Sequence, residues 1–233
     1  MRHKKNQKGI TILETIIAIF VIMVGITSAV VLIIASTSAA RKTKNELIAS
    51  NLARETIEVI RNKRDSNWLK IESGELASSM WDDGLGDYIN NYYDGIYHFD
   101  DEGIGPDDPA FGWTFFYEDD YDIDDLNDLR PQIYYHDDSG AKLYNQYDGA
   151  IFLPPAGQNT IFRRVFETNP ICYDETVVPQ EMIATTESGD DCDSLPDNRK
   201  KIGIQVVVHV HWRDVGNNKT FELIQEDRLY NWK

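Results

Sequence analysis

The sequence predicts an α+β fold in which one long N-terminal helix precedes an antiparallel β-sheet. No proline interrupts residues 10–65, and this stretch is apolar in its first half and amphipathic in its second half. Alternation of apolar and polar residues, the pattern of strands with one buried face, becomes clear only after Arg130. Between these parts lies a large insertion rich in Gly, Pro and Asp, residues 66–130, which predicts loops.

The N-terminus combines a short basic segment with a long apolar run. Residues 1–9 contain four basic residues, and residues 10–35 are 26 residues with a single ionisable side chain, Glu14. A helix of that length reaches about 39 Å, enough to cross a bilayer with some tilt. Because the basic residues precede the run, we expect the N-terminus in the cytoplasm and the C-terminal part outside it.

Glu14 does not fit a plain membrane anchor. A carboxylate at bilayer depth costs roughly 2.5–3.5 kcal/mol, so it is a functional candidate that needs a partner. If a peptidase cuts after Gly9, Ile10 carries a new, positively charged α-amino group. When two such helices pack side by side with a small axial stagger, the amine of one meets the carboxylate of the other. Each group then compensates the charge of its neighbour.

This combination resembles the type IV prepilin signature: a short basic leader ending in Gly, a cut before a hydrophobic residue, and Glu at the fifth position of the mature chain. The resemblance covers residue 8 to about residue 35, with Ile10 where Phe is usual. In this family a prepilin peptidase cleaves after the Gly and methylates the new N-terminus. The resemblance therefore implies cleavage between Gly9 and Ile10, and N-methylation of Ile10.

The resemblance also implies how the chain assembles. Such subunits first lie in the lipid bilayer of the cytoplasmic, or inner, membrane. They then pack their apolar helices into the core of a periplasmic or extracellular filament, at an inner-membrane assembly platform. The implied partners are thus other pilin or pseudopilin subunits, with Glu14 as the assembly group that neutralises a neighbouring N-terminus. Gly25 is a candidate weak point of the helix, and a small residue for close helix packing is an equally good interpretation.

Two simpler interpretations of the N-terminus stay open. A secretory signal peptide also has a basic start and an apolar core, and residues 35–40 faintly resemble its cleavage site of small residues. Its apolar region is usually about 7–15 residues, which is shorter than the run found here. A simple signal anchor fits the length but leaves Glu14 unexplained.

The second half of the helix, residues 36–65, is expected to pack under a globular head. On a helical wheel one face is apolar and the other polar. The apolar face consists of Ile48, Ala49, Leu52, Ala53, Thr56, Val59 and Ile60. Residues 51–61 also resemble the post-membrane helix of minor pilins and of a minor pseudopilin of type II secretion.

The chain is strongly acidic. Its net charge is −16, and removal of residues 1–9 lowers this to −20. Such a chain lacks the basic footprint of a nucleic-acid-binding protein, so no nucleic-acid partner is expected. The insertion at residues 66–130 concentrates the acidic side chains but is also rich in aromatic residues, so we expect it to be ordered.

Two acidic clusters are candidate calcium sites, and no other cofactor is expected. The first has Asp at three EF-hand ligand positions but lacks the Gly and Glu that such a loop requires, so that motif fails. A solvated acidic surface is the alternative for both clusters. The candidates are Asp120, Asp122 and Asp124 in the first cluster and Asp190, Asp191 and Asp193 in the second.

The two cysteines, Cys172 and Cys192, lie 20 positions apart in a segment predicted to be a polar loop, residues 170–198. Disulfides persist outside the cytoplasm, and pilins commonly close a C-terminal loop with one, so the resemblance implies a bond between them. Two free thiols are the alternative.

The C-terminal part, residues 131–233, is predicted to be an antiparallel meander. Its apolar face should bury against Ile48, Leu52 and Val59 of the helix. The predicted strands are residues 132–136, 142–147, 160–167, 201–212 and 220–232.

No enzymatic motif is present: the sequence has no phosphate-binding Gly loop, nucleophile elbow or metalloprotease helix. His209 and His211 share a strand face, as metal ligands could, but no third ligand lies at an identifiable spacing, and a polar sheet face is the alternative. We therefore expect a minor structural subunit of a type IV pilus-like filament rather than an enzyme. A minor pseudopilin of a type II secretion system and a filament-tip adhesin, the latter resting on residues 66–130, are the alternatives.

Overall fold

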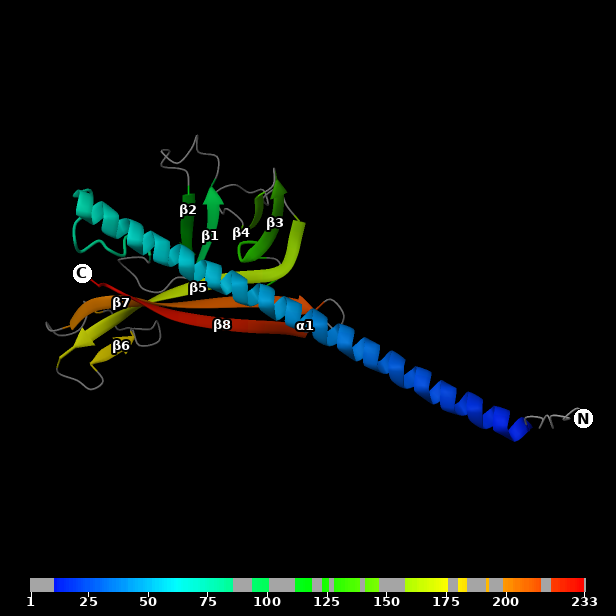
Figure 1. Cartoon of the computed structure of the whole chain (residues 1–233). Helices are drawn as coiled ribbons and strands as arrows, with labels where there is room; N and C mark the ends of the chain where they lie inside the picture. The colour runs from blue at the N-terminus through cyan, green and yellow to red at the C-terminus, as the bar shows by residue number, and fades with distance from the viewer. Residues whose placement is uncertain are drawn as a thin grey trace, which may run out of the picture. The chain divides into compact units, whose positions relative to one another are not determined.

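The structure is a computed structural model that describes residues 11–85, 94–100, 112–118, 123–125, 128–138, 141–146, 158–175, 180–183, 192, 199–214 and 219–232. Within them one helix is followed by eight strands, which confirms an α+β layout with an antiparallel sheet (Figure 1). The chain divides into two compact units, Met1–Glu46 and Leu47–Lys233. The elements are α1 (Ile12–Ser73), β1 (Asp94–Asp100), β2 (Gly112–Glu118), β3 (Gln132–Asp138), β4 (Ala141–Gln146), β5 (Gln158–Asp174), β6 (Glu181–Ile183), β7 (Arg199–Asp214) and β8 (Lys219–Tyr230).

Helix α1 ends at Ser73, two turns later than the predicted end at residue 65. Buried side chains explain the extension: Asn67 donates from Nδ2 to the carbonyl oxygens of Trp81 (3.2 Å) and Asp83 (2.8 Å), and these bonds hold the segment after the helix against its last turns. The helix stops at Gly74, whose φ of +83° lies in the left-handed region that glycine adopts at helix ends.

Strand β5 is the centre of the sheet. Strand β7 pairs with it from Phe162 to Asp174, and β8 pairs with β7 in turn. The other edge of β5 pairs in succession with β3, β1 and β6, and the hairpin partners β4 and β2 extend it further. Every pairing is antiparallel, but the order is more complex than the predicted meander.

The prediction of loops throughout residues 66–130 was wrong in part, because β1 and β2 lie inside this insertion and pair with each other over their full length. Both strands are rich in aromatic residues, which favour strands, but flanking Gly, Pro and Asp residues concealed the pattern. Phe115 of β2 contacts Phe166 of β5 edge to face, with ring centroids 6.0 Å apart. The insertion thus adds a hairpin to the sheet.

Strand β5 also continues past the predicted end at residue 167, so Cys172 lies in a strand and not in a polar loop. The predicted polar loop began at Pro170. This proline lies between the stretch of β5 that pairs with β1 and the stretch that pairs with β6, so its missing N–H interrupts neither pairing. The predicted strands 201–212 and 220–232 are confirmed as β7 and β8, and the hairpin near residue 140 is confirmed as β3 and β4.

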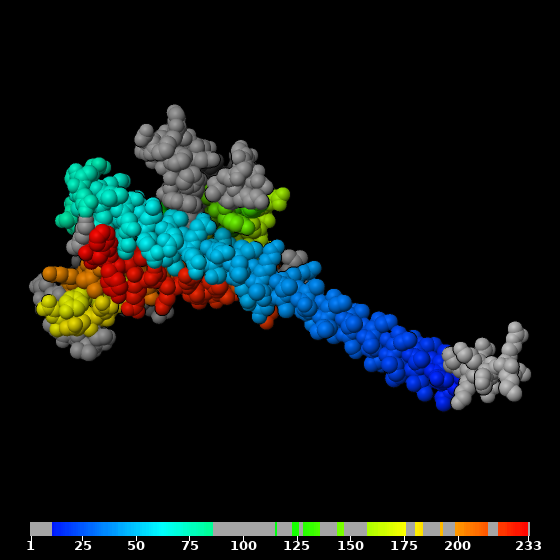
Figure 2. Space-filling model, in the orientation of Figure 1, coloured from blue at the N-terminus to red at the C-terminus, as the bar shows by residue number. Residues whose placement is uncertain are grey.

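The hydrophobic core lies between the sheet and residues 47–73 of α1. Leu52 and Val59 are buried against sheet residues and Ile48 is partly buried there, as predicted. Figure 2 shows the cyan surface of this part of α1 directly against the red surface of β8. A guanidinium nitrogen of Arg61 on α1 lies 2.7 Å from a carboxylate oxygen of Asp227 on β8, so an ion pair supplements the apolar contact.

Candidate functional site

The first half of α1 presents an apolar surface. Its large side chains between Ile12 and Ile34 are all exposed, for example Phe20 at 66 % and Leu32 at 70 %. The helix contains a stretch that is long and apolar enough to cross a membrane, and none of this stretch is buried. A continuous apolar surface of this size requires a cover of lipid or protein.

Hydroxyl groups within this stretch are satisfied by the helix itself. Thr27 donates to the carbonyl oxygen of Met23 (2.6 Å), Ser28 to that of Val24 (2.8 Å), and Thr37 to that of Ile33 (3.0 Å). Such bonds to the preceding turn let Ser and Thr lie in an apolar environment without an outside partner. These hydroxyl groups therefore do not interfere with burial in lipid or among other helices.

Glu14 differs from them. It lies in the first turn of α1, where its backbone N–H points to the Thr11 hydroxyl at 3.4 Å, and its carboxylate forms no hydrogen bond or ion pair with any part of the chain that the structure describes. The predicted cleavage and methylation positions, Gly9 and Ile10, lie outside the described residues. Processing at that bond stays a prediction.

At Gly25 the helix continues without a break. A Cβ atom added there would meet nothing within 4 Å, so the described chain does not itself require a glycine at this position. Both interpretations of Gly25, as a weak point and as a site of close packing with another helix, stay predictions.

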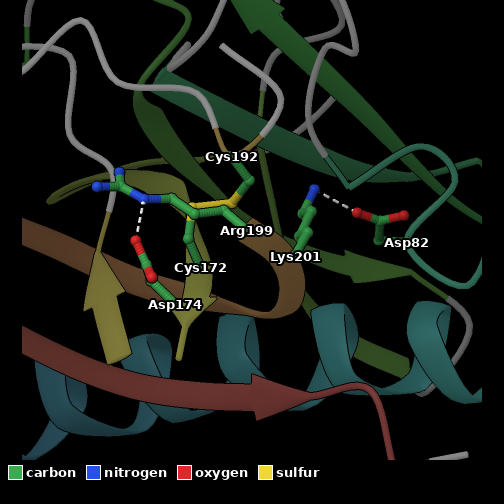
Figure 3. The surroundings of a disulfide bond; sticks show 6 residues. All are labelled: Asp82, Cys172, Asp174, Cys192, Arg199 and Lys201. Atoms are coloured by element: carbon green, nitrogen blue, oxygen red, sulfur yellow. Dashed lines mark hydrogen bonds and ion pairs between the residues drawn. A yellow bond between two sulfur atoms is a disulfide. The ribbon is translucent and has the colours of Figure 1, made fainter. Parts of the chain in front are cut away.

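The disulfide between Cys172 and Cys192 is confirmed, and both residues are buried (Figure 3). Beside it, Arg199 donates from Nε to Asp174 at 2.8 Å, across the pairing of β5 and β7. Lys201 of β7 forms an ion pair with Asp82, which belongs to the segment after α1 (Figure 3). The disulfide thus lies where two strands and the segment after the helix are joined.

Of the calcium candidates, Asp120, Asp122, Asp190, Asp191 and Asp193 lie outside the described residues. Asp124 is described, and its Oδ1 lies 2.9 Å from Nδ1 of His211. Within the described chain this carboxylate therefore contacts a histidine.

His209 lies between two carboxylates. Its Nε2 is 3.4 Å from Oε1 of Glu167, and its Nδ1 is 3.2 Å from Oε1 of Glu222. The contact with Glu167 raises the pKa of His209 above its ordinary value; burial opposes this rise and Glu222 adds to it. The same contact with His209 lowers the pKa of Glu167, against its own burial.

Glu222 is the residue that sequence reasoning missed. It lies directly opposite His211 in the register of the β7–β8 hairpin. Residues 215–218 read Val-Gly-Asn-Asn, a turn sequence between the predicted strands 201–212 and 220–232. Counting outward from this turn places His211 and Glu222 opposite each other, so the signal was present in the sequence.

The described structure thus defines an α+β chain with one candidate membrane-spanning helix near the N-terminus and a disulfide-linked antiparallel sheet. No protein-family model, curated protein or solved structure matches this chain.

Proposed function

We propose that this chain is a minor subunit of a type IV pilus-like filament, cleaved by a prepilin peptidase and assembled through its N-terminal helix. The observation that carries the proposal is Glu14, a carboxylate with no partner in the described chain at the start of an exposed apolar helix. A negative charge at that depth is costly in a plain anchor and useful where a neighbouring subunit brings a positive charge.

Cleavage after Gly9 supplies that charge. The new α-amino group of Ile10 then lies four residues from Glu14, about 6 Å along a helix. In a filament whose helices are displaced along their axes by a small stagger, the amine of one subunit meets the Glu14 carboxylate of the next. Lipid covers the apolar surface before assembly and neighbouring helices cover it afterwards.

The head supports the same proposal. The order of a long helix followed by an antiparallel sheet is the pilin order, and the disulfide suits an exported domain in an oxidising compartment. We accordingly place the N-terminus in the cytoplasm and the head outside. A minor pseudopilin of type II secretion would carry the same signature, and gene neighbourhood separates the two: retraction-motor genes favour the pilus, secretin and piston genes the pseudopilus.

The test compares Glu14→Ala and Glu14→Gln with Glu46→Ala. Glu46 lies on the same helix beyond the apolar stretch. Its contact among the described residues is an exposed ion pair with Lys42 at 3.6 Å, so it is a matched control. All three variants should insert into the membrane, because loss of the Glu14 carboxylate from bilayer depth removes a desolvation cost and Glu46 lies beyond the apolar stretch.

The measurement is the amount of each variant in sheared filaments relative to the amount in membranes. Both Glu14 variants should be depleted from the filament fraction while Glu46→Ala matches the wild type. Equal incorporation of all the variants would show that Glu14 is not an assembly group.

A further inference from the structure

The two histidines noted in the sequence lie on the sheet face away from α1. Strand β7 turns Val208, Val210 and Trp212 into the core, so the alternate residues His209 and His211 point to the opposite face. On β8, Phe221 and Leu223 pack against the core, and Glu222 between them is exposed on the same face as the histidines. The three side chains therefore meet on one surface.

Their ligand atoms converge. Nδ1 of His209 lies 3.2 Å and Nε2 of His211 lies 3.0 Å from the same oxygen, Oε1 of Glu222. One ligand atom from each residue lies within 4.8 Å of those of the other two. In a tetrahedral zinc site with bonds of about 2.0–2.1 Å, neighbouring ligand atoms are about 3.3 Å apart. The cluster thus needs only small adjustments to surround an ion.

Within the described residues, one nitrogen of the cluster lacks a well-directed hydrogen bond. His211 is 9 % exposed, and its buried Nε2 forms no hydrogen bond within the described chain, although Glu222 lies within ion-pair distance. The other nitrogen, Nδ1, contacts the carboxylate of Asp124 at 2.9 Å. A neutral imidazole that donates from Nδ1 to Asp124 keeps a lone pair on Nε2. Oε1 of Glu222 lies 3.0 Å from this nitrogen but off the direction of its lone pair, and a cation bound by the lone pair would also lie within reach of that oxygen.

Each histidine contacts a second carboxylate through its other ring nitrogen. Glu167 lies 3.4 Å from Nε2 of His209, as Asp124 lies beside Nδ1 of His211. In metal sites the histidine nitrogen that does not bind the ion commonly donates to a carboxylate, which fixes the tautomer and the ring orientation. Both histidines have this arrangement, and in both the nitrogen that remains faces Glu222.

We propose that His209, His211 and Glu222 bind a transition-metal ion of the Zn²⁺ class, with the fourth position open to water. Two imidazoles and one carboxylate are ligands that suit Zn²⁺, and three protein ligands with an open position are a recurring arrangement. Ca²⁺ is not expected here, because it takes six to eight oxygen ligands. The ion would link β7 to β8, and His211, one of its ligands, would connect it to Asp124. This inference does not depend on the filament proposal.

The test is a calorimetric titration of the untagged full-length chain in detergent, stripped with EDTA, exchanged into buffer and titrated with ZnCl₂. Excess Ca²⁺ in the buffer competes for sites made of carboxylates alone, which favours a response to Zn²⁺ from a site with nitrogen ligands. The wild type should bind a single ion per chain. His209→Gln, His211→Gln and Glu222→Gln should each abolish this binding, and Glu167→Gln should weaken it by about 10–100-fold.

Glu226→Gln is the matched control. Glu226 lies on the same strand, is exposed, and accepts a hydrogen bond from Gln205, away from the cluster. The Glu226→Gln variant should bind Zn²⁺ as the wild type does. Circular dichroism establishes that each variant is folded, and Co²⁺ bound to the wild type should give the visible absorption of tetrahedral nitrogen and oxygen coordination. Unchanged Zn²⁺ binding in the histidine variants, displacement of Zn²⁺ by Ca²⁺, or no saturable binding by the wild type would overturn the proposal.

Discussion

Arg164 of β5 heads the fully buried side chains of the described residues, although arginine is ordinarily exposed. It is 0 % exposed, on the sheet face that packs against α1. Its Nε donates to Oε1 of Gln146 (3.1 Å), its Nη1 points to the carbonyl oxygen of Leu52 (3.4 Å), and Oε1 of Glu55 lies 3.9 Å from Nη1. A buried guanidinium with such partners ties β5 and β4 to the helix.

Arg164→Ala should destabilise the chain by about 3–5 kcal/mol, because it removes one member of a buried polar group and leaves a cavity. Arg164→Met should cost less, since it keeps most of the volume and introduces no charge. Arg228→Ala is the control: this arginine is exposed, lies 3.8 Å from Glu181, and should contribute no more than about 1 kcal/mol. Urea unfolding of the full-length chain in detergent measures all three. If Arg164→Ala lowers the free energy of unfolding no more than Arg228→Ala does, this account of the core is refuted.

At the scale of elements, the disulfide links the C-terminal end of β5 to Cys192 across 20 sequence positions. Closing a loop of that size should raise the free energy of unfolding by roughly 3 kcal/mol, chiefly because it lowers the conformational entropy of the unfolded chain. The double variant Cys172→Ser/Cys192→Ser should still fold, because β5 pairs with β7 over thirteen residue pairs without it, but its free energy of unfolding should fall by about this amount.

Reduced wild type is the control for that variant. Treatment with dithiothreitol should lower the melting temperature of the wild type to that of the double variant and leave the variant unchanged. Alkylation before reduction should label neither cysteine of the exported wild-type protein. Labelling of both would contradict the disulfide.

The elements that sequence reasoning found are those with a regular pattern. The apolar and amphipathic parts of α1 and the alternation in β7 each specify an element and its buried face, so the packing of Leu52 and Val59 on the sheet was predictable. Strands β1 and β2 were missed because their strand-forming aromatic residues lie between loop signals. The pairing of β1 with β5 is a long-range contact that no local pattern encodes.

In the histidine cluster, too, the local pattern predicts some residues and only the folded structure brings in the others. The shared face of His209 and His211 follows from alternation along one strand. Glu222 requires the register of the hairpin, and Glu167 requires the neighbouring strand β5. Asp124 belongs to a segment outside the strands, and its contact with His211 depends on how the chain folds.

For the whole molecule, the two units have different physical requirements. Leu47–Lys233 buries its own core, whereas Met1–Glu46 exposes apolar side chains and one carboxylate without a partner in the described chain. The mature chain would carry a net charge of −20, and heads with that charge repel one another when packed densely. We therefore expect this subunit to be sparse in the filament.

The most direct measurement of the central claim is the mass of the N-terminal peptide of the chain extracted from membranes. The account predicts a chain that begins at Ile10 with a methylated α-amino group, and Gly9→Val should leave an uncut precursor in the membrane. A chain that begins at Met1 would indicate a simple anchor, and one that begins after Ala40 would indicate a secretory signal peptide. Either result would contradict assembly through a processed N-terminal helix.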